Sequence, residues 1–232
     1  MEFRVDPRNI ALSLLTVAIV LVVAHVAGAV SSHVFHHAQV FGLVDTFDMN
    51  VENNVPTFFS TFLFVAGAAL LAVIASQSNA ERYTGYWNWL AIIFAFMAVD
   101  EDASLHELLI EPVRDLLAVS GPLYFAWVIP YGLAVLVVGL LYLRFVWSLP
   151  VRTRGLFVGA GSLFLGGAIG FESMGGWYFS LHGEMEDLPY SLLVAAEEFC
   201  EMSGIILFIY ALLNYLRDRL AGEPLRIIIA RP

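Results

Sequence analysis

The sequence of 232 residues contains no lysine, a single cysteine and few charged residues. Because there is no lysine amine, a retinal Schiff base, a pyridoxal phosphate lysine and a Walker P-loop are all excluded. The lone Cys200 excludes an intramolecular disulfide and a cysteine-type zinc site. The net charge of −10 argues against binding to nucleic acid.

Hydrophobic residues dominate what is present. They make up 59% of the chain, against 14% for charged residues, and the mean hydropathy is +0.78. Soluble domains are nearer half apolar and a quarter charged. The composition therefore predicts an integral membrane protein whose main partner is the lipid bilayer. No linker rich in proline, serine or charge divides the chain, so we expect a single domain over residues 1–232.

Six apolar runs have the length of about 20 residues that crosses a bilayer of about 30 Å. We therefore predict an all-α bundle of six transmembrane helices. The first run is longer than the apolar core of a signal peptide, so we expect it to be retained. The predicted spans cover residues 10–30, 55–76, 87–109, 123–147, 156–178 and 190–216.

Arginine sets the predicted orientation, because positive residues accumulate in cytoplasmic loops. With the N-terminus in the cytoplasm, ten of the eleven arginines fall inside and only Arg114 falls outside. This places both termini in the cytoplasm. We expect a multi-pass protein of a bacterial or archaeal plasma (inner) membrane.

Acidic residues and histidines follow the opposite pattern. All six histidines and most acids fall in the outer half of the predicted bundle. At about 1.5 Å per helical residue, Glu197, Glu198 and Glu201 lie roughly 10 to 16 Å below the outer boundary. Asp100 lies about 10 Å below it. Glu172 and His25 lie nearer 5 Å, again as a rough count. Ionisable groups from four spans thus share one layer.

Such groups need compensation, since an acid at the centre of a span costs about 2.5–3.5 kcal/mol. No arginine lies in the outer half of any span, so protons or a metal ion must neutralise the acids. Carboxylates with imidazoles favour iron, manganese or zinc. The sequence predicts a mononuclear or dinuclear site with these candidate ligands: Asp100, Glu101, His106, Glu107, Glu172, Glu197, Glu198 and Glu201, with His25 and His182 as further candidates.

Helical spacing refines this prediction. In the last span, Glu197, Glu198 and Glu201 occupy one sector roughly 100° wide and can all face the bundle interior. If the third span is helical to residue 109, its polar residues form two stripes, with Glu101 between them. One stripe contains Asp100, Ser104, Glu107 and Glu111, and the other contains Asp102 and His106. The glycines over residues 166–176 predict close helix packing beside Glu172.

Two resemblances concern ligand type. His33-x-x-His36-His37 resembles the HxxHH boxes of membrane desaturases, although only one such box is present and it falls on the outer side. Carboxylates on several helices resemble the di-iron sites of ferritin-like bundles. The Glu-x-x-His pair of those sites is missing, because His106 follows Ala103 by three residues.

Three functions remain open. The first is a metal-dependent membrane enzyme, an oxidoreductase or hydrolase, acting on a lipid-like or other membrane-soluble substrate. The second is a proton or divalent-cation transporter that uses the acids as its binding station. The third is a membrane cytochrome with His25, His106 or His182 as axial ligands. The cytochrome is ranked last, because haem binding leaves the surplus of carboxylates unexplained.

Overall fold

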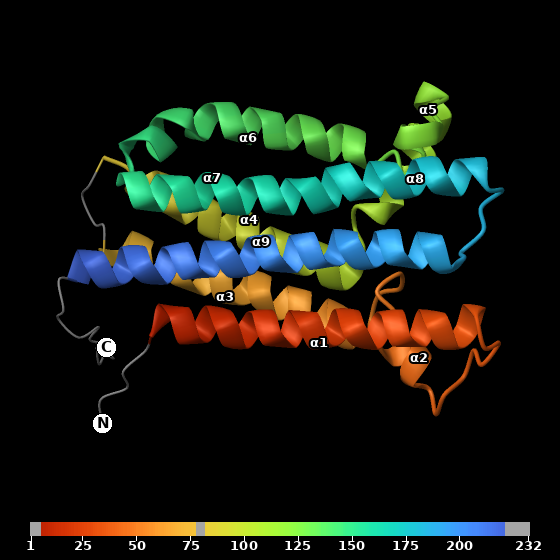
Figure 1. The fold of residues 1–232 in the computed structure, drawn as a ribbon. Coiled ribbons are helices and arrows are strands. Elements are labelled where there is room, and N and C mark those ends of the chain that lie inside the picture. Colours follow the sequence, from red (N-terminus) through yellow and green to blue (C-terminus); the bar gives the residue numbers. More distant parts are fainter. Residues whose placement is uncertain (1–5, 78–81, 221–232) are drawn as a thin grey trace, which may run out of the picture.

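A computed structural model describes residues 6–77 and 82–220, and this part of the chain is helical without any strand (Figure 1). Long helical rods run side by side along one axis, and short elements join them. The rods are α1 (Pro7–His33), α3 (Val55–Gln77), α4 (Thr84–Ala103), α6 (Val128–Ser148), the continuous α7 (Val151–Leu165), η3 (Gly166–Phe171) and α8 (Glu172–Leu181), and α9 (Leu188–Leu220). The short elements are α2 (Leu43–Thr46), η1 (Glu107–Leu109), α5 (Ile110–Leu117) and η2 (Gly121–Leu123).

Four of these rods are long and apolar enough to cross a membrane: α1, α3, α6 and the rod Val151–Leu181. The all-α prediction is therefore confirmed, together with apolar helices of spanning length. Neither α4 nor α9 is among the four, and both carry acidic side chains in or near the predicted membrane layer. The count of six spans stays a prediction.

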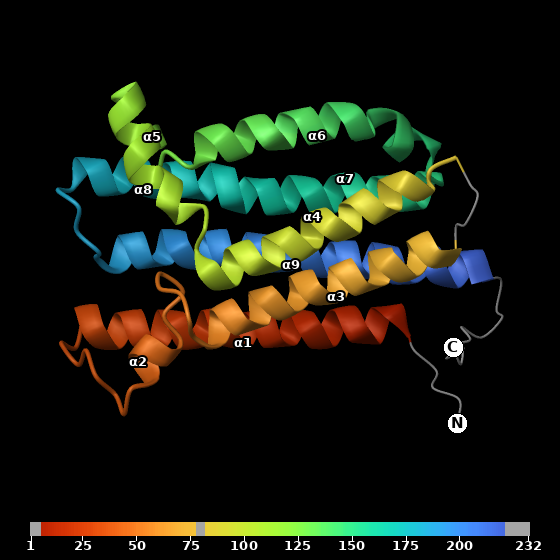
Figure 2. The same ribbon diagram turned by 180° about the vertical axis from the view of Figure 1, so that it is seen from behind.

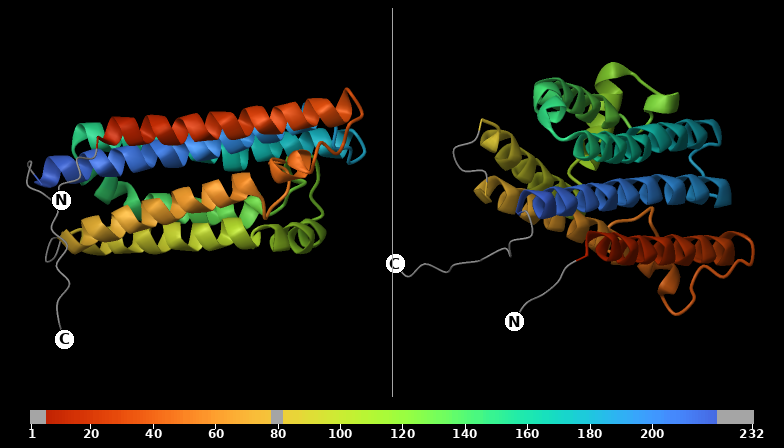
Figure 3. Two further views of the ribbon diagram at one scale, coloured as in Figure 1. Left: turned by 90° about the horizontal axis from the view of Figure 1, so that it is seen from below. Right: turned by 60° about the vertical axis from the view of Figure 1, so that its left-hand side comes forward.

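Helix α9 lies at the centre of the bundle and packs against α1, α3, α7, η3 and α8 (Figures 1 and 3). Its fully enclosed side chains include Met202, Ala211 and Leu212. Helix α3 pairs closely with α4. Because α9 is surrounded by other helices, apolar side chains on most of its circumference find partners, and the acids of its first half must face a shared interior.

The bundle has two chemically different ends. The start of α1, the end of α3, the start of α4 and the end of α9 lie together, with the α6–α7 connection beside them (Figures 1 and 2). The arginines of the described residues lie near this end, apart from Arg114 on α5 at the opposite end. Which end faces the cytoplasm stays a prediction, and Arg4, Arg226 and Arg231 lie outside the described residues.

The prediction that the third span is helical to residue 109 was wrong. Helix α4 ends at Ala103, where Ser104 adopts a left-handed backbone with φ of 49°. The N–H groups of Ser104 and Leu105 both donate to the Asp100 carbonyl, which closes the helix end. The two predicted stripes therefore do not continue beyond Ala103, and the chain turns His106 back toward Asp100.

The fourth span begins later than predicted, at Val128, because residues 124–127 form turns after η2. Pro130 then lies in the first helical turn, where its missing N–H costs no hydrogen bond. The fifth span is longer than predicted and contains the π-helical segment Gly166–Phe171. The remaining predicted boundaries agree with the helices to within a few residues.

Candidate functional site

The central feature is an acidic cluster in which carboxyl groups from several segments meet. Glu52 comes from the loop before α3, Glu101 from the end of α4, Glu172 from the start of α8, and the rest from α9. Each is partly buried. Their strongest electrostatic partners are one another, Asp100, Glu107 and His106. The acidic cluster consists of Glu52, Glu101, Glu172, Glu197, Glu198 and Glu201.

Some carboxyl groups of this cluster lie close to one another. Those of Glu172 and Glu197 are near enough to share a proton, or a cation in the place of that proton. Ser60 of α3 lies beside the Glu101 carboxyl group. Burial raises the pKa of Glu52 in its loop, and a bond to Thr57 only partly opposes this effect. The cluster is thus built to accept positive charge.

Asp100 and His106 form a pair beside the cluster. Asp100 is only 2% exposed, and its Oδ1 accepts a hydrogen bond of 2.8 Å from the Tyr131 hydroxyl. Its Oδ2 lies 3.3 Å from Nδ1 of His106. Burial lowers the pKa of His106, but the hydrogen bond and charge of Asp100 outweigh burial, so the pKa is raised. The pair directs the Nδ1 proton to Asp100, while Nε2 keeps a lone pair when the ring is neutral.

His106 lies within electrostatic range of Glu52, Glu172 and Glu198. The indole of Trp127 packs against its ring at a centroid distance of 4.8 Å. Trp127 Nε1 also donates a hydrogen bond of 2.6 Å to Glu172 Oε1. One aromatic side chain therefore positions two ionisable groups, a histidine from the turn after α4 and a carboxylate from α8.

Close packing holds α9 against the rod that carries Glu172. A Cβ added to Gly167 would lie 2.7 Å from the Glu197 carbonyl oxygen and 2.8 Å from Glu201 Cγ. The predicted close approach at the glycine run is confirmed at this position. Gly167 lies in the π-helical segment directly before Glu172. Such segments are rare and are found frequently at functional sites.

Three residues of the environment were missed by sequence reasoning: Ser60, Trp127 and Tyr131. Glu52 was not among the predicted ligands either. Trp127 and Tyr131 are four residues apart, so they lie on one helical face with their polar tips toward one side. The spacing of these two hydrogen-bonding aromatic residues is the sequence pattern that could have identified them as part of the site. No local pattern indicates that Ser60 meets Glu101, because the contact joins two helices.

His25 lies elsewhere, in a structural network. Its Nδ1 accepts a hydrogen bond of 3.0 Å from the Met49 backbone N–H, and its Nε2 lies 3.1 Å from the Ser191 carbonyl oxygen. These two bonds place the proton on Nε2 and leave neither nitrogen for a metal. Asp48 Oδ1 lies 3.4 Å from the same Nδ1, but the shorter Met49 bond requires the lone pair. His25 is left out of the site.

The remaining candidates, His182 and Glu107, are both exposed. His182 is exposed, stacks on Tyr178 at 4.0 Å and places Nδ1 2.9 Å from that residue's carbonyl oxygen. Glu107 is exposed at the start of η1. In the His33-x-x-His36-His37 segment, His36 and His37 are exposed.

As the side chains lie, no three His, Cys, Asp or Glu residues within 6–77 and 82–220 are grouped to hold a metal ion. Glu101, Glu172, Glu197, Glu198 and Glu201 nevertheless lie within electrostatic range of one another, with Asp100 and His106 beside them. Their role as ligands stays a prediction.

The fold and the cluster define a class: an all-α protein with helices that can cross a membrane and an acidic cluster shared by several of them. The chain belongs to the family described as "Domain of unknown function (DUF8692)", which matches residues 13–216. No curated protein and no solved structure matches the chain. The matched range includes the whole acidic cluster.

Proposed function

We propose that this chain is a six-span membrane metalloprotein. Its acidic cluster binds one or two divalent transition-metal ions, and it acts as a metal-dependent oxidoreductase or hydrolase on a membrane-soluble substrate. One observation carries the proposal. Six carboxyl groups from four segments interact with one another, and no arginine is among their strongest electrostatic partners.

A bound metal ion would balance the negative charge of the acidic cluster. Uncompensated acids within a bilayer cost about 2.5–3.5 kcal/mol each near its centre. Protons can neutralise them one by one, but a divalent ion neutralises two carboxylates and binds their oxygens directly. The approach of the Glu172 and Glu197 carboxyl groups gives one position where a cation would replace a proton. Metal binding would require neighbouring side chains to rotate toward a common point.

The composition of the site fits iron, manganese or zinc, which take carboxylate and imidazole ligands. Metal-bound histidines usually donate their second ring N–H to a carboxylate, which orients the ring. Asp100 and His106 form such a pair, with Tyr131 holding Asp100 on the other side. The proposed ligands are His106 through Nε2 and the acidic cluster: Glu52, Glu101, Glu172, Glu197, Glu198 and Glu201.

A bound ion would supply Lewis acidity and activate water or oxygen. The residues of the chain would position its ligands. Trp127 holds Glu172 by its indole N–H, and Asp100 holds His106. Phe125, Phe164 and Phe179 pack against the hydrophobic core of the bundle, and such apolar surroundings would suit an apolar substrate. The arginine-rich end would face the cytoplasm and place the cluster in the outer leaflet.

Elemental analysis of purified protein tests the proposal. We expect stoichiometric iron, manganese or zinc in the wild type and its loss in Glu198→Gln. Glu111→Gln, which removes an exposed acid of α5, serves as the matched control and should keep the metal. Wild-type protein that retains none of the three metals after reconstitution would overturn the proposal. Ion flux in liposomes, with Glu197→Gln as the variant, would then examine the transporter alternative.

A further inference from the structure

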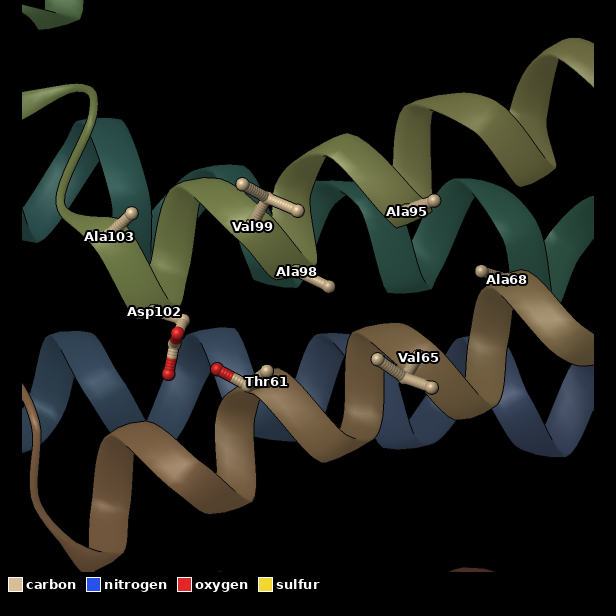
Figure 4. A pocket seen from close by; sticks show the side chains of 8 residues that line it. All are labelled: Thr61, Val65, Ala68, Ala95, Ala98, Val99, Asp102 and Ala103. Atoms are coloured by element: carbon tan, nitrogen blue, oxygen red, sulfur yellow. The ribbon is translucent and has the colours of Figure 1, made fainter.

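A groove between α3 and α4 lies outside the acidic cluster (Figure 4). Its volume is about 330 Å³, within the range of small-molecule sites. Small and branched apolar side chains form most of its walls, including Val65, Ala68, Ala95 and Ala98. Val65 is 51% exposed, so the groove opens on the outer surface of the bundle. In a membrane this opening would face the lipid tails.

The groove has one polar end. Thr61 of α3 and Asp102 of α4 point toward each other there (Figure 4). Thr61 Oγ1 is hidden from solvent and has no hydrogen-bond partner among the described residues. A buried hydroxyl without a partner is costly and is satisfied when a ligand supplies one. The polar end therefore presents a carboxylate and an unsatisfied hydroxyl to a ligand bound in the groove.

This polar end is separate from the acidic cluster, although the residues are neighbours in sequence. Ser60 lies beside Glu101 on the cluster side, while Thr61 and Asp102 line the groove. Successive side chains on a helix differ in direction by about 100°, which explains how adjacent residues serve two sides of the same helix pair. Binding in the groove thus does not depend on a metal in the cluster.

We propose that the groove binds a single-chain amphiphile with a primary ammonium head group. The alkyl chain lies along Val65, Ala68 and Ala95, and the head lies between Thr61 and Asp102. An ammonium carries three N–H donors and no acceptor, so it satisfies the carboxylate and the hydroxyl together. An anionic head would meet the carboxylate of Asp102 and the negative cluster nearby, and it would be repelled.

The test uses the full chain in detergent after removal of metal by a chelator, so it does not depend on the metalloenzyme proposal. The probes are octadecylamine, octadecanol and octadecanoate, and native mass spectrometry measures their binding. We expect one octadecylamine to bind saturably, at least tenfold more tightly than either of the other two. Equal binding of octadecanol or octadecanoate would overturn the ammonium assignment.

Variants locate the site. Asp102→Asn removes the charge at an exposed position with little change of shape, and we expect at least tenfold weaker binding of octadecylamine. Ala95→Leu fills the groove from an exposed position and should abolish binding. Asp115→Asn on α5 is the matched control and should bind as the wild type does. Wild-type affinity in Asp102→Asn would overturn the proposal, whatever the fate of Ala95→Leu.

Discussion

Nδ1 of His106 lies 3.3 Å from Oδ2 of Asp100, across the turn that ends α4. The left-handed backbone at Ser104 makes this contact possible, because a continuous helix would carry His106 onward to the next turn. A buried carboxylate that already accepts a hydrogen bond from Tyr131 thereby orients the histidine beside the acidic cluster.

Asp100→Asn tests this orientation. We expect metal affinity to fall by about 10- to 100-fold, as for other carboxylates that bond to a metal-binding histidine. Titration against a competing chelator measures the affinity, and Asp115→Asn provides the control for loss of one acid. Affinity equal to that of the wild type would show that Asp100 does not act through His106 on a metal.

His25→Ala should destabilise the protein without loss of metal. The change leaves the Met49 N–H and the Ser191 carbonyl without their buried partner, at a cost of about 1–3 kcal/mol for each unsatisfied group. Thermal unfolding in detergent should show a lower midpoint, whereas His37→Ala, at an exposed position, should not. Loss of metal in folded His25→Ala protein would return His25 to the list of ligands.

Gly167→Ala should lower stability by about 1–3 kcal/mol, since the new methyl group would overlap the Glu197 carbonyl and push α9 away. Gly170→Ala is a matched control in the same π-helical segment, because a Cβ there meets nothing within 4 Å. The midpoints of thermal unfolding of the two variants are compared with that of the wild type. Equal midpoints would mean that the close approach at Gly167 does not contribute to stability.

The environment of Asp187 predicts that the stability of the protein depends on pH. Burial raises the pKa of Asp187, but hydrogen bonds from the Tyr178 hydroxyl and the Tyr190 N–H outweigh burial, so the pKa is lowered. The stabilisation is therefore present above the unfolded pKa of about 3.9 and is lost as the pH falls through the lower folded pKa. Asp187 also caps the start of α9.

We expect Asp187→Ala to unfold at a lower temperature than the wild type at pH 7, by the loss of a cap worth about 0.5–2 kcal/mol. The difference should shrink as the pH is lowered below about 4, where the wild-type carboxylate is protonated too. Asp115→Ala should show no such pattern. If the difference in unfolding temperature stays constant down to low pH, the cap does not depend on the negative charge of Asp187.

Much of the architecture could be predicted from local patterns. Apolar runs of spanning length become helices because a bilayer or a bundle interior leaves no other partner for their backbone groups. Arginines at one end and acids at the other follow from the order of the runs along the chain. The sector shared by Glu197, Glu198 and Glu201 follows from helical geometry, and the depth estimates place Asp100 and Glu172 in the same layer as these acids.

The features that local patterns did not predict depend on contacts between segments. The turn after Ala103, the hydrogen bond of Trp127 to Glu172 and the pairing of Ser60 with Glu101 each join residues whose relation depends on how helices pack. His25 and His106 show the difference most clearly. Both are histidines of the predicted outer half of the bundle, yet one is enclosed by backbone partners and the other faces carboxylates. Composition and periodicity determine which residues enter the bundle, and only the tertiary structure decides which of them meet.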